Sequence, residues 1–230
     1  MTPSEFELEF DLLYNNINSN RAPGVDIYEK SVFLTQAQET VVTTLYNTFE
    51  KDEATREYLS SLLKVITYKT GTAKTNTDNF LSTSQSIYVL PKDLMFIVYE
   101  DILPQNNECY KDNINVKAVQ MNDLPRMLKN PFTGPNSRQA LRVNLNDGKG
   151  NDCVEIYSIY SNFWYKLGYL SKPEPIILYT QNDDCGNLTI NGVSAGNTPK
   201  GCLLNTSLHR TILETAVQNA TAAYKSITTE

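Results

Sequence analysis

The sequence predicts an α+β protein in which helices from both ends of the chain form a bundle, with a β-rich insertion between them. Apolar residues recur at helical spacing up to residue 66 and again after residue 205. Between these stretches Thr, Asn, Tyr and β-branched residues dominate, as they do in short strands. We therefore expect a helical bundle of residues 1–66 and 205–230. A sandwich- or barrel-like insertion domain is expected for residues 67–204.

The first third of the chain is expected to contain several helices, because capping residues precede its apolar stretches. The residues that predict a helix start are Ser4 with Glu7, Asp26, Thr35 with Gln38, and Asp52. Residues 21–25 contain Pro and Gly and are expected to break the first helix. The apolar faces expected for the first and last of these helices are Phe6, Phe10, Leu13 and Ile17, and Leu59, Leu62, Leu63 and Ile66.

The middle of the chain is expected to form strands, which we place at residues 86–90, 94–100, 116–120, 141–145, 154–161 and 176–180. The turn-rich residues 146–151 lie between two of these stretches and predict a hairpin. Asn191-Gly192 predicts a second hairpin turn. A brief helix is expected at residues 121–128 and a long final helix at residues 207–227, which would pack on the amino-terminal helices.

Composition and charge exclude several classes of protein. A hydrophobic fraction of 40% in 230 residues argues for a folded core. No run of 18 apolar residues exists, so a membrane span is excluded, and residues 1–5 lack the features of a signal peptide. Residues 1–60 contain 11 acidic and 4 basic side chains, whereas the rest has 15 and 16. The acidic helical part is therefore not expected to be a DNA-binding module.

The sequence contains no recognisable set of catalytic residues or metal ligands, and we expect neither an enzyme nor a cofactor. His209 is the only histidine, which argues against a hydrolase triad. The four cysteines are widely spaced and are expected to be reduced thiols. The oxygen-rich residues 146–152 and 181–186 do not match a calcium loop, and Glu155 with Glu174 has no defined separation.

An aromatic cluster is the one feature that would suit a ligand such as a carbohydrate. Its members are Tyr157, Tyr160, Phe163, Trp164, Tyr165 and Tyr169. Aromatic residues are also enriched in sheet cores and subunit interfaces, and this is the interpretation that we favour. A glycan- or receptor-binding module, or a hydrolase of unfamiliar type, stay open as alternatives.

Several segments together resemble the connector proteins, ring or adaptor, of crAss-like podoviruses that infect gut Bacteroidota. The resemblance starts with SEFELEFDLLYNN at residues 4–16, APGVD at 22–26 and YEKSVFLTQAQ at 28–38. It continues with KNPFTGPN at residues 129–136, RQALR at 138–142, YLSKPEPIIL at 169–178 and LHRTILETAV at 208–217. This pattern spans most of the chain.

The resemblance implies a virion structural protein, assembled in the host cytoplasm, that forms a ring of the portal–tail connector. Such a ring typically has twelve copies around a channel through which the genome passes without specific binding. Its partners would be further copies of the chain, the portal protein and neighbouring tail rings. The residues that we expect at the contact between copies are Pro131, Phe132, Arg138 and Arg142.

Overall fold

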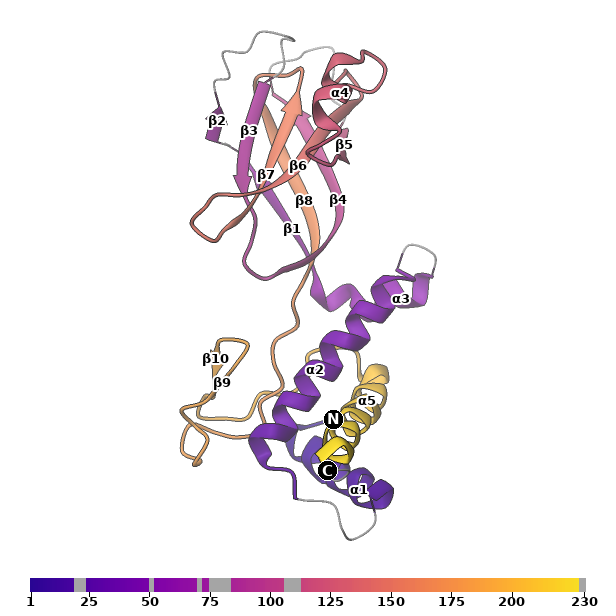
Figure 1. Cartoon of the computed structure of the whole chain (residues 1–230), viewed down its shortest axis with the longest axis vertical. Helices are drawn as coiled ribbons and strands as arrows, with labels where there is room; N and C mark the ends of the chain where they lie inside the picture. The colour runs from indigo at the N-terminus through magenta and orange to yellow at the C-terminus, as the bar shows by residue number, and fades with distance from the viewer. Residues whose placement is uncertain (19–23, 50–51, 70–71, 75–83, 106–112, 228–230) are drawn as a thin grey trace. The chain divides into compact units, whose positions relative to one another are not determined.

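The computed structural model describes residues 1–18, 24–49, 52–69, 72–74, 84–105 and 113–227 (Figure 1). The chain divides into two compact units. We call Met1–Leu62 with Lys172–Glu230 the helical unit and Leu63–Ser171 the sheet unit. The predicted α+β class is confirmed.

The helical unit contains α1 (Pro3–Asn18), α2 (Ile27–Tyr46), α3 (Glu53–Leu59) with a short 3-10 turn after it (Ser60–Leu62), and α5 (Thr206–Ile227). Within this unit α5 packs against α1 and α2. The α1 contact places the Phe6 ring 5.4 Å from the His209 ring. The α2 contact includes Phe33 and Tyr224, whose ring centroids are 6.4 Å apart.

Capping side chains are found at the helix starts of this unit. They are not all the residues that the sequence led us to expect. Asp26 and Glu29 form the capping box of α2, and the Asp52 side chain accepts a bond from the amide of Ala54. The box of α1 consists of Thr2 and Glu5, so the predicted pair Ser4 and Glu7 is wrong by two residues.

An extended segment, residues 174–178, runs along α2 and is called here the strap. It was expected to be part of a strand at residues 176–180, and that prediction is wrong. The Ile177 backbone pairs with Lys200 on one edge of the strap, and buried polar side chains of α2 supply the hydrogen bonds on the other edge. The Ser31 hydroxyl accepts from the Leu178 amide at 3.0 Å, and the Thr35 hydroxyl accepts from the Ile176 amide at 3.1 Å.

The sequence suggested that Thr35 and Gln38 start a helix, but they do not. Each lies in the middle of α2 and faces the strap, because residues 31, 35 and 38 share one side of a helix. The Gln38 amide donates to the Glu174 carbonyl at 3.2 Å. Beyond the strap, Asn191 and Gly192 both adopt positive φ between the short strands β9 (Thr189–Ile190) and β10 (Val193–Ser194). This confirms the predicted hairpin turn.

The sheet unit is a curled eight-stranded sheet with the strand order β1-β8-β4-β5-β6-β7-β3-β2. Its strands are β1 (Leu63–Tyr68), β2 (Thr72–Lys74), β3 (Ser84–Val89), β4 (Leu94–Pro104), β5 (Ile114–Ala118), β6 (Gln139–Asn146), β7 (Asp152–Ser158) and β8 (Phe163–Ser171). Neighbours are antiparallel except β5 and β6, which are parallel. The curl brings the edge strand β1 close to β3 near the other end of the sheet, where the Tyr68 hydroxyl donates to the Val89 carbonyl at 2.8 Å.

Both faces of the sheet carry buried apolar side chains. The inner face of the curl holds a cluster that includes Tyr88, Ile102, Ile156, Tyr165 and Leu167. The outer face is covered near β6 and β7 by α4 (Leu124–Lys129), whose Leu124 packs with Leu141, Val143 and Tyr157. The predicted strands before residue 170 and the short helix are thus confirmed, with shifted ends. The predicted helix through Ile66 is wrong, because β1 begins at Leu63.

Candidate interaction surfaces

Three of the four expected contact residues lie on one exposed loop. This Phe132 loop, residues 130–138, connects α4 to β6 in the sheet unit. Pro131, Phe132 and Arg138 are all exposed, and the Phe132 side chain has 90% of its surface accessible. A phenylalanine so fully exposed is a typical feature of an interaction site rather than of a surface that faces only water.

Hydrogen bonds within the Phe132 loop fix its shape. The Asn130 side chain accepts from the Phe132 amide at 3.0 Å, and the Asn130 carbonyl accepts from the Gly134 amide at 2.8 Å. A Cβ on Gly134 would lie 3.0 Å from the carbonyl oxygens of Met127 and Asn130, so any other residue would push this tight turn outward by a few tenths of an ångström. The Gln139 amide closes the loop on the Thr133 carbonyl at 3.2 Å. The ring of Phe132 is therefore held outward by an ordered turn.

Arg142 lies in a different environment from the other three residues. It is in the middle of β6 and is buried, and its Nε lies 3.0 Å from Oε2 of Glu100 on β4. Its Nη1 donates to the Asn144 side chain at 2.9 Å, and the Tyr165 hydroxyl donates to the other oxygen of Glu100. Burial raises the pKa of Glu100, while the Tyr165 hydrogen bond and the Arg142 charge oppose that rise. The guanidinium charge of Arg142 is therefore paired with Glu100 inside the sheet unit.

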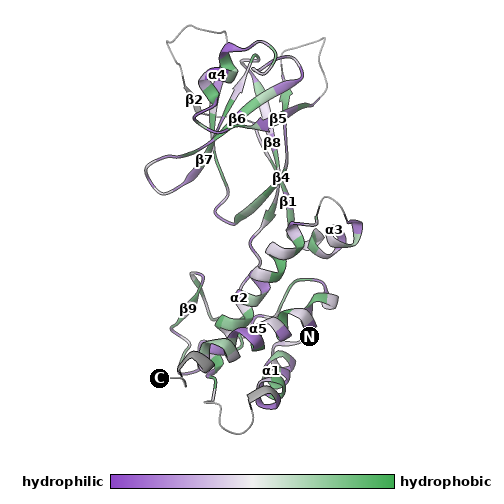
Figure 2. Cartoon of the chain, turned by 45° about the vertical axis from the view of Figure 1, so that its right-hand side comes forward, coloured by the Kyte–Doolittle hydropathy of each residue, from purple (hydrophilic) through white to green (hydrophobic). Residues whose placement is uncertain are grey.

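A second exposed apolar surface lies on α1 and was not anticipated from the sequence. Phe6, Phe10 and Tyr14 are buried along one side, while Leu8 and Leu12 are 65% and 64% exposed on another. We call Leu8 and Leu12 the α1 outer pair. Hydrophobic and hydrophilic positions alternate along this helix in Figure 2. The signal was present in the sequence, since leucines four residues apart share a helix face.

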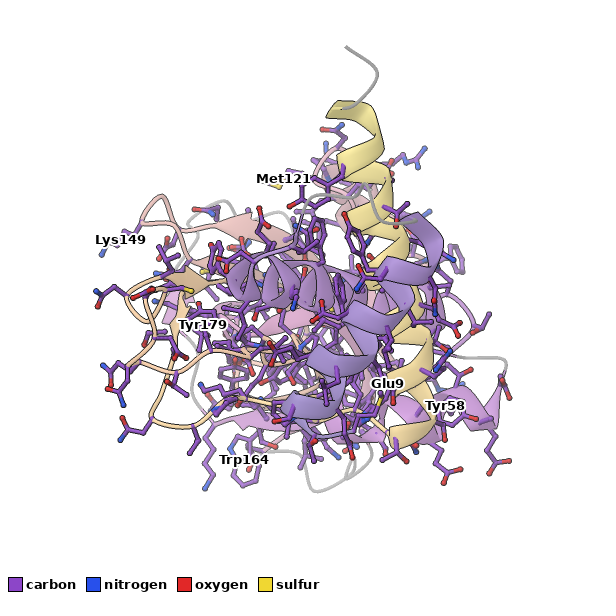
Figure 3. The ribbon with its side chains drawn as sticks, turned by 90° about the horizontal axis from the view of Figure 1, so that it is seen from below. Glu9, Tyr58, Met121, Lys149, Trp164 and Tyr179 are labelled. Carbon is purple, nitrogen blue, oxygen red and sulfur yellow. The ribbon has the colours of Figure 1, made fainter. Side chains whose placement is uncertain are left out.

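Carboxylates surround the α1 outer pair, and two cations of the helical unit neutralise some of them. Lys30 lies 2.8 Å from Asp11 and 3.9 Å from Glu7. Arg210 on α5 lies 3.4 Å from Glu9, which is labelled in Figure 3 where α1 runs beside α5. Glu5 accepts the Thr2 amide, and this hydrogen bond holds its pKa below the ordinary value.

The histidine and the paired acids considered for catalysis have structural partners instead. The His209 ring is buried, with Nδ1 2.7 Å from the amino group of Met1 and Nε2 3.0 Å from the Leu204 carbonyl. Glu155 is buried and accepts the Tyr157 hydroxyl at 2.9 Å, whereas Glu174 is exposed in the other unit.

The loops and cysteines considered as ligands are likewise accounted for by local structure. Asp147 accepts the amides of Lys149 and Asn151, which shapes the β6–β7 turn whose tip, Lys149, points outward in Figure 3. Asp183 binds the amide and hydroxyl of Thr180. Within the described ranges, no three His, Cys, Asp or Glu residues are grouped as metal ligands would be. Cys153, Cys185 and Cys202 are free thiols, and Cys109 lies outside the described residues.

Most of the aromatic cluster belongs to the sheet. Tyr157, Phe163, Tyr165 and Tyr169 are buried, and Tyr160 packs against the inner core. Trp164 is partly exposed, with the Lys69 ammonium 5.7 Å from its ring centre. The rings therefore fill the core rather than forming an open platform for a sugar.

In the part of the chain that the structure describes, no helix has the length and hydropathy needed to cross a membrane.

Comparison with known proteins gives consistent matches over the whole chain. The family described as phage tail ring protein 3/4 matches residues 1–230. Ring protein 3 of Bacteroides phage crAss001 is 36% identical, covering 99% of this chain and 98% of that protein. Ring protein 4/5 of the same phage is 35% identical, covering 98% and 94%. The chain thus belongs to the phage tail ring protein 3/4 family of crAss-like phages.

Proposed function

We propose that this chain is a non-enzymatic virion protein that forms one ring of the connector between portal and tail. The observation that carries the proposal is the full-length similarity to two ring proteins of one phage. Copies of the chain would surround a channel for the genome, with twelve copies as the expected number. The portal and neighbouring rings would be its partners, and assembly would take place in the host cytoplasm.

The charge distribution supports different roles for the two units. The helical unit has 16 acidic and 8 basic side chains, a formal charge of −8, and the sheet unit has 10 and 12, a charge of +2. A channel wall that is acidic repels phosphates and lets DNA slide without being retained. We assign the wall to the helices of the helical unit. The sheet unit would contact neighbouring copies and rings.

Electron microscopy and mass photometry of the purified full-length chain test this function, alone and mixed with the portal and adjoining ring proteins of its phage. We expect a ring with a central hole and twelve times the subunit mass in at least the mixed sample. Mass spectrometry of purified virions should detect the chain. The proposal fails if no ring forms in either sample and the virion lacks the chain.

A further inference from the structure

We propose that copies of this chain associate head to tail, with Phe132 of one copy packed on Leu8 and Leu12 of the next. This contact rests on the proposed ring function and names the two surfaces that would build the ring. All three side chains are largely exposed in the isolated chain, at 90%, 65% and 64%. Burying apolar rings and leucines against each other is the main driving force of protein association.

Both surfaces are preorganised by the rest of their unit. The Phe132 loop is closed by the bonds of Asn130 and by the Gln139–Thr133 bond. The α1 outer pair lies on a helix whose opposite side is anchored by the buried rings of Phe6 and Phe10. Neither surface must be ordered when it binds, so little conformational entropy is lost on association.

The charges that surround the two surfaces are opposite in sign. Arg126, Lys129 and Arg138 are exposed in the segment that contains Phe132, against a single acid, Asp123, which leaves a charge of +2. The acids on and beside the α1 outer pair are Glu5, Glu7, Glu9, Asp11 and Glu214. Among the described groups, Lys30, Arg210 and the Met1 amino group oppose them, which leaves a charge of −2. Opposite charges around the two apolar surfaces favour this pairing. They disfavour contact of either surface with its own copy, because like charges would then meet.

A second copy is the occupant that fits best, because the chain carries both complementary halves. Two unlike surfaces on one subunit make a heterologous contact, and repetition of such a contact gives a ring when the rotation between copies divides a full turn. The contact of a surface with its own copy across a two-fold axis would bring like charges together. Another tail protein on either surface is an outcome that the experiment distinguishes.

Complementary variants of the full-length chain test the pairing. Phe132→Ser removes one half of the contact, and Leu8→Ser with Leu12→Ser removes the other. We expect each variant alone to lose the association that sedimentation velocity detects in the wild-type chain. A mixture of the two should form a one-to-one heterodimer and nothing larger, because only one intact contact is available. Added salt should weaken this heterodimer, since the rims are charged.

Matched variants control for the loss of any exposed apolar side chain. Leu203, which is 65% exposed, and Ile159, which is 43% exposed, lie outside both surfaces. Leu203→Ser and Ile159→Ser should associate like the wild type. Thermal unfolding of all variants should be unchanged, since the substituted side chains are exposed. If the mixture gives no heterodimer although both variants are folded, the pairing is overturned.

A photocross-link covers the case in which the contact is too weak for sedimentation. p-Benzoylphenylalanine replaces Phe132, and copies labelled with ¹⁴N and ¹⁵N are mixed and irradiated at the highest soluble concentration. Mixed-isotope peptides should join position 132 to residues of α1, while the same probe at position 159 should not. Cross-links that map elsewhere, or none between copies, overturn the pairing. Rings seen by microscopy with cross-links elsewhere would leave the ring function standing and reject only this contact.

Discussion

The two units of the chain satisfy their buried backbone in different ways. In the sheet unit, strands bond one another, and the inner face also buries the ion pair of Arg142 and Glu100. In the helical unit, one edge of the strap pairs with Lys200 through the Ile177 backbone, and side chains of α2 bond the other edge. A helix that presents hydroxyls at the spacing of its own turns can thus bond one edge of a buried extended segment in place of a strand.

The difference has a practical consequence for measuring stability. Trp164 is the only tryptophan and lies in β8, so its fluorescence reports on the sheet unit. Four of the five α-helices that the structure describes belong to the helical unit, so helical circular dichroism reports mainly on that unit. The two signals separate the units in one urea titration, and a variant of one unit should move its own signal first.

Breaking the ion pair of the sheet unit should have the largest effect. Arg142→Met leaves the Glu100 carboxylate buried without its cation, which should cost about 3–5 kcal/mol of unfolding free energy. Urea unfolding followed by Trp164 fluorescence measures the loss. The double variant Arg142→Met with Glu100→Gln removes the charge but keeps an acceptor for the Tyr165 hydroxyl. It should recover most of the loss, and a single variant as stable as the wild type would refute the pair's role.

Removing one strap hydroxyl should have an intermediate effect, confined to the helical unit. Thr35→Val keeps the shape of the side chain but leaves the buried Ile176 amide without its acceptor. We expect a loss of about 1–3 kcal/mol, read from helical circular dichroism in urea. Thr40 is the matched control, because it is exposed on the same helix and its hydroxyl bonds only the Gln36 carbonyl there. Equal losses in Thr35→Val and Thr40→Val would show that the strap contact adds nothing.

The predictions from sequence were best where one local pattern decides the outcome. Alternation at Leu141, Val143 and Leu145, followed by the turn that Asp147 shapes, was enough to place the β6–β7 hairpin. The final helix was likewise clear from its periodicity. The strap was misread because its apolar run is typical of a strand, and only the tertiary contact with α2 decides otherwise. The same contact explains why Thr35 and Gln38 looked like a helix start.

The candidate surfaces were only partly predictable for a similar reason. The Phe132 loop was found through family resemblance, and its exposure agrees with a contact role, which stays a prediction. Arg142 was grouped with it by sequence proximity, although it lies on the strand that follows, where side chains alternate between two buried faces. The α1 outer pair was not predicted, because the spacing of Phe6 and Phe10 defines the buried side of α1. Which of two apolar stripes faces the core depends on α5, far away in the sequence.

The smallest expected effect is a pH dependence of the helical unit that originates at His209. Burial lowers the pKa of its imidazole below the ordinary 6.5, and the nearby amino group of Met1 acts in the same direction. Only the neutral ring with its proton on Nε2 can both accept from that amino group and donate to the Leu204 carbonyl.

Because the unfolded chain binds this proton more readily, stability should be full above pH 6.5 and should fall as the pH drops below it. We expect the unfolding free energy of the wild type, compared with His209→Gln, to lose its advantage between about pH 7 and pH 5. The loss should be smaller than that of Thr35→Val and visible in helical circular dichroism but not in Trp164 fluorescence. A constant difference between the two proteins over this range would mean that His209 stays neutral or is equally protonated in both states. A fluorescence transition that shifts by the same amount would mean that the two units do not unfold separately. The two signals would then not distinguish the stability of one unit from that of the other.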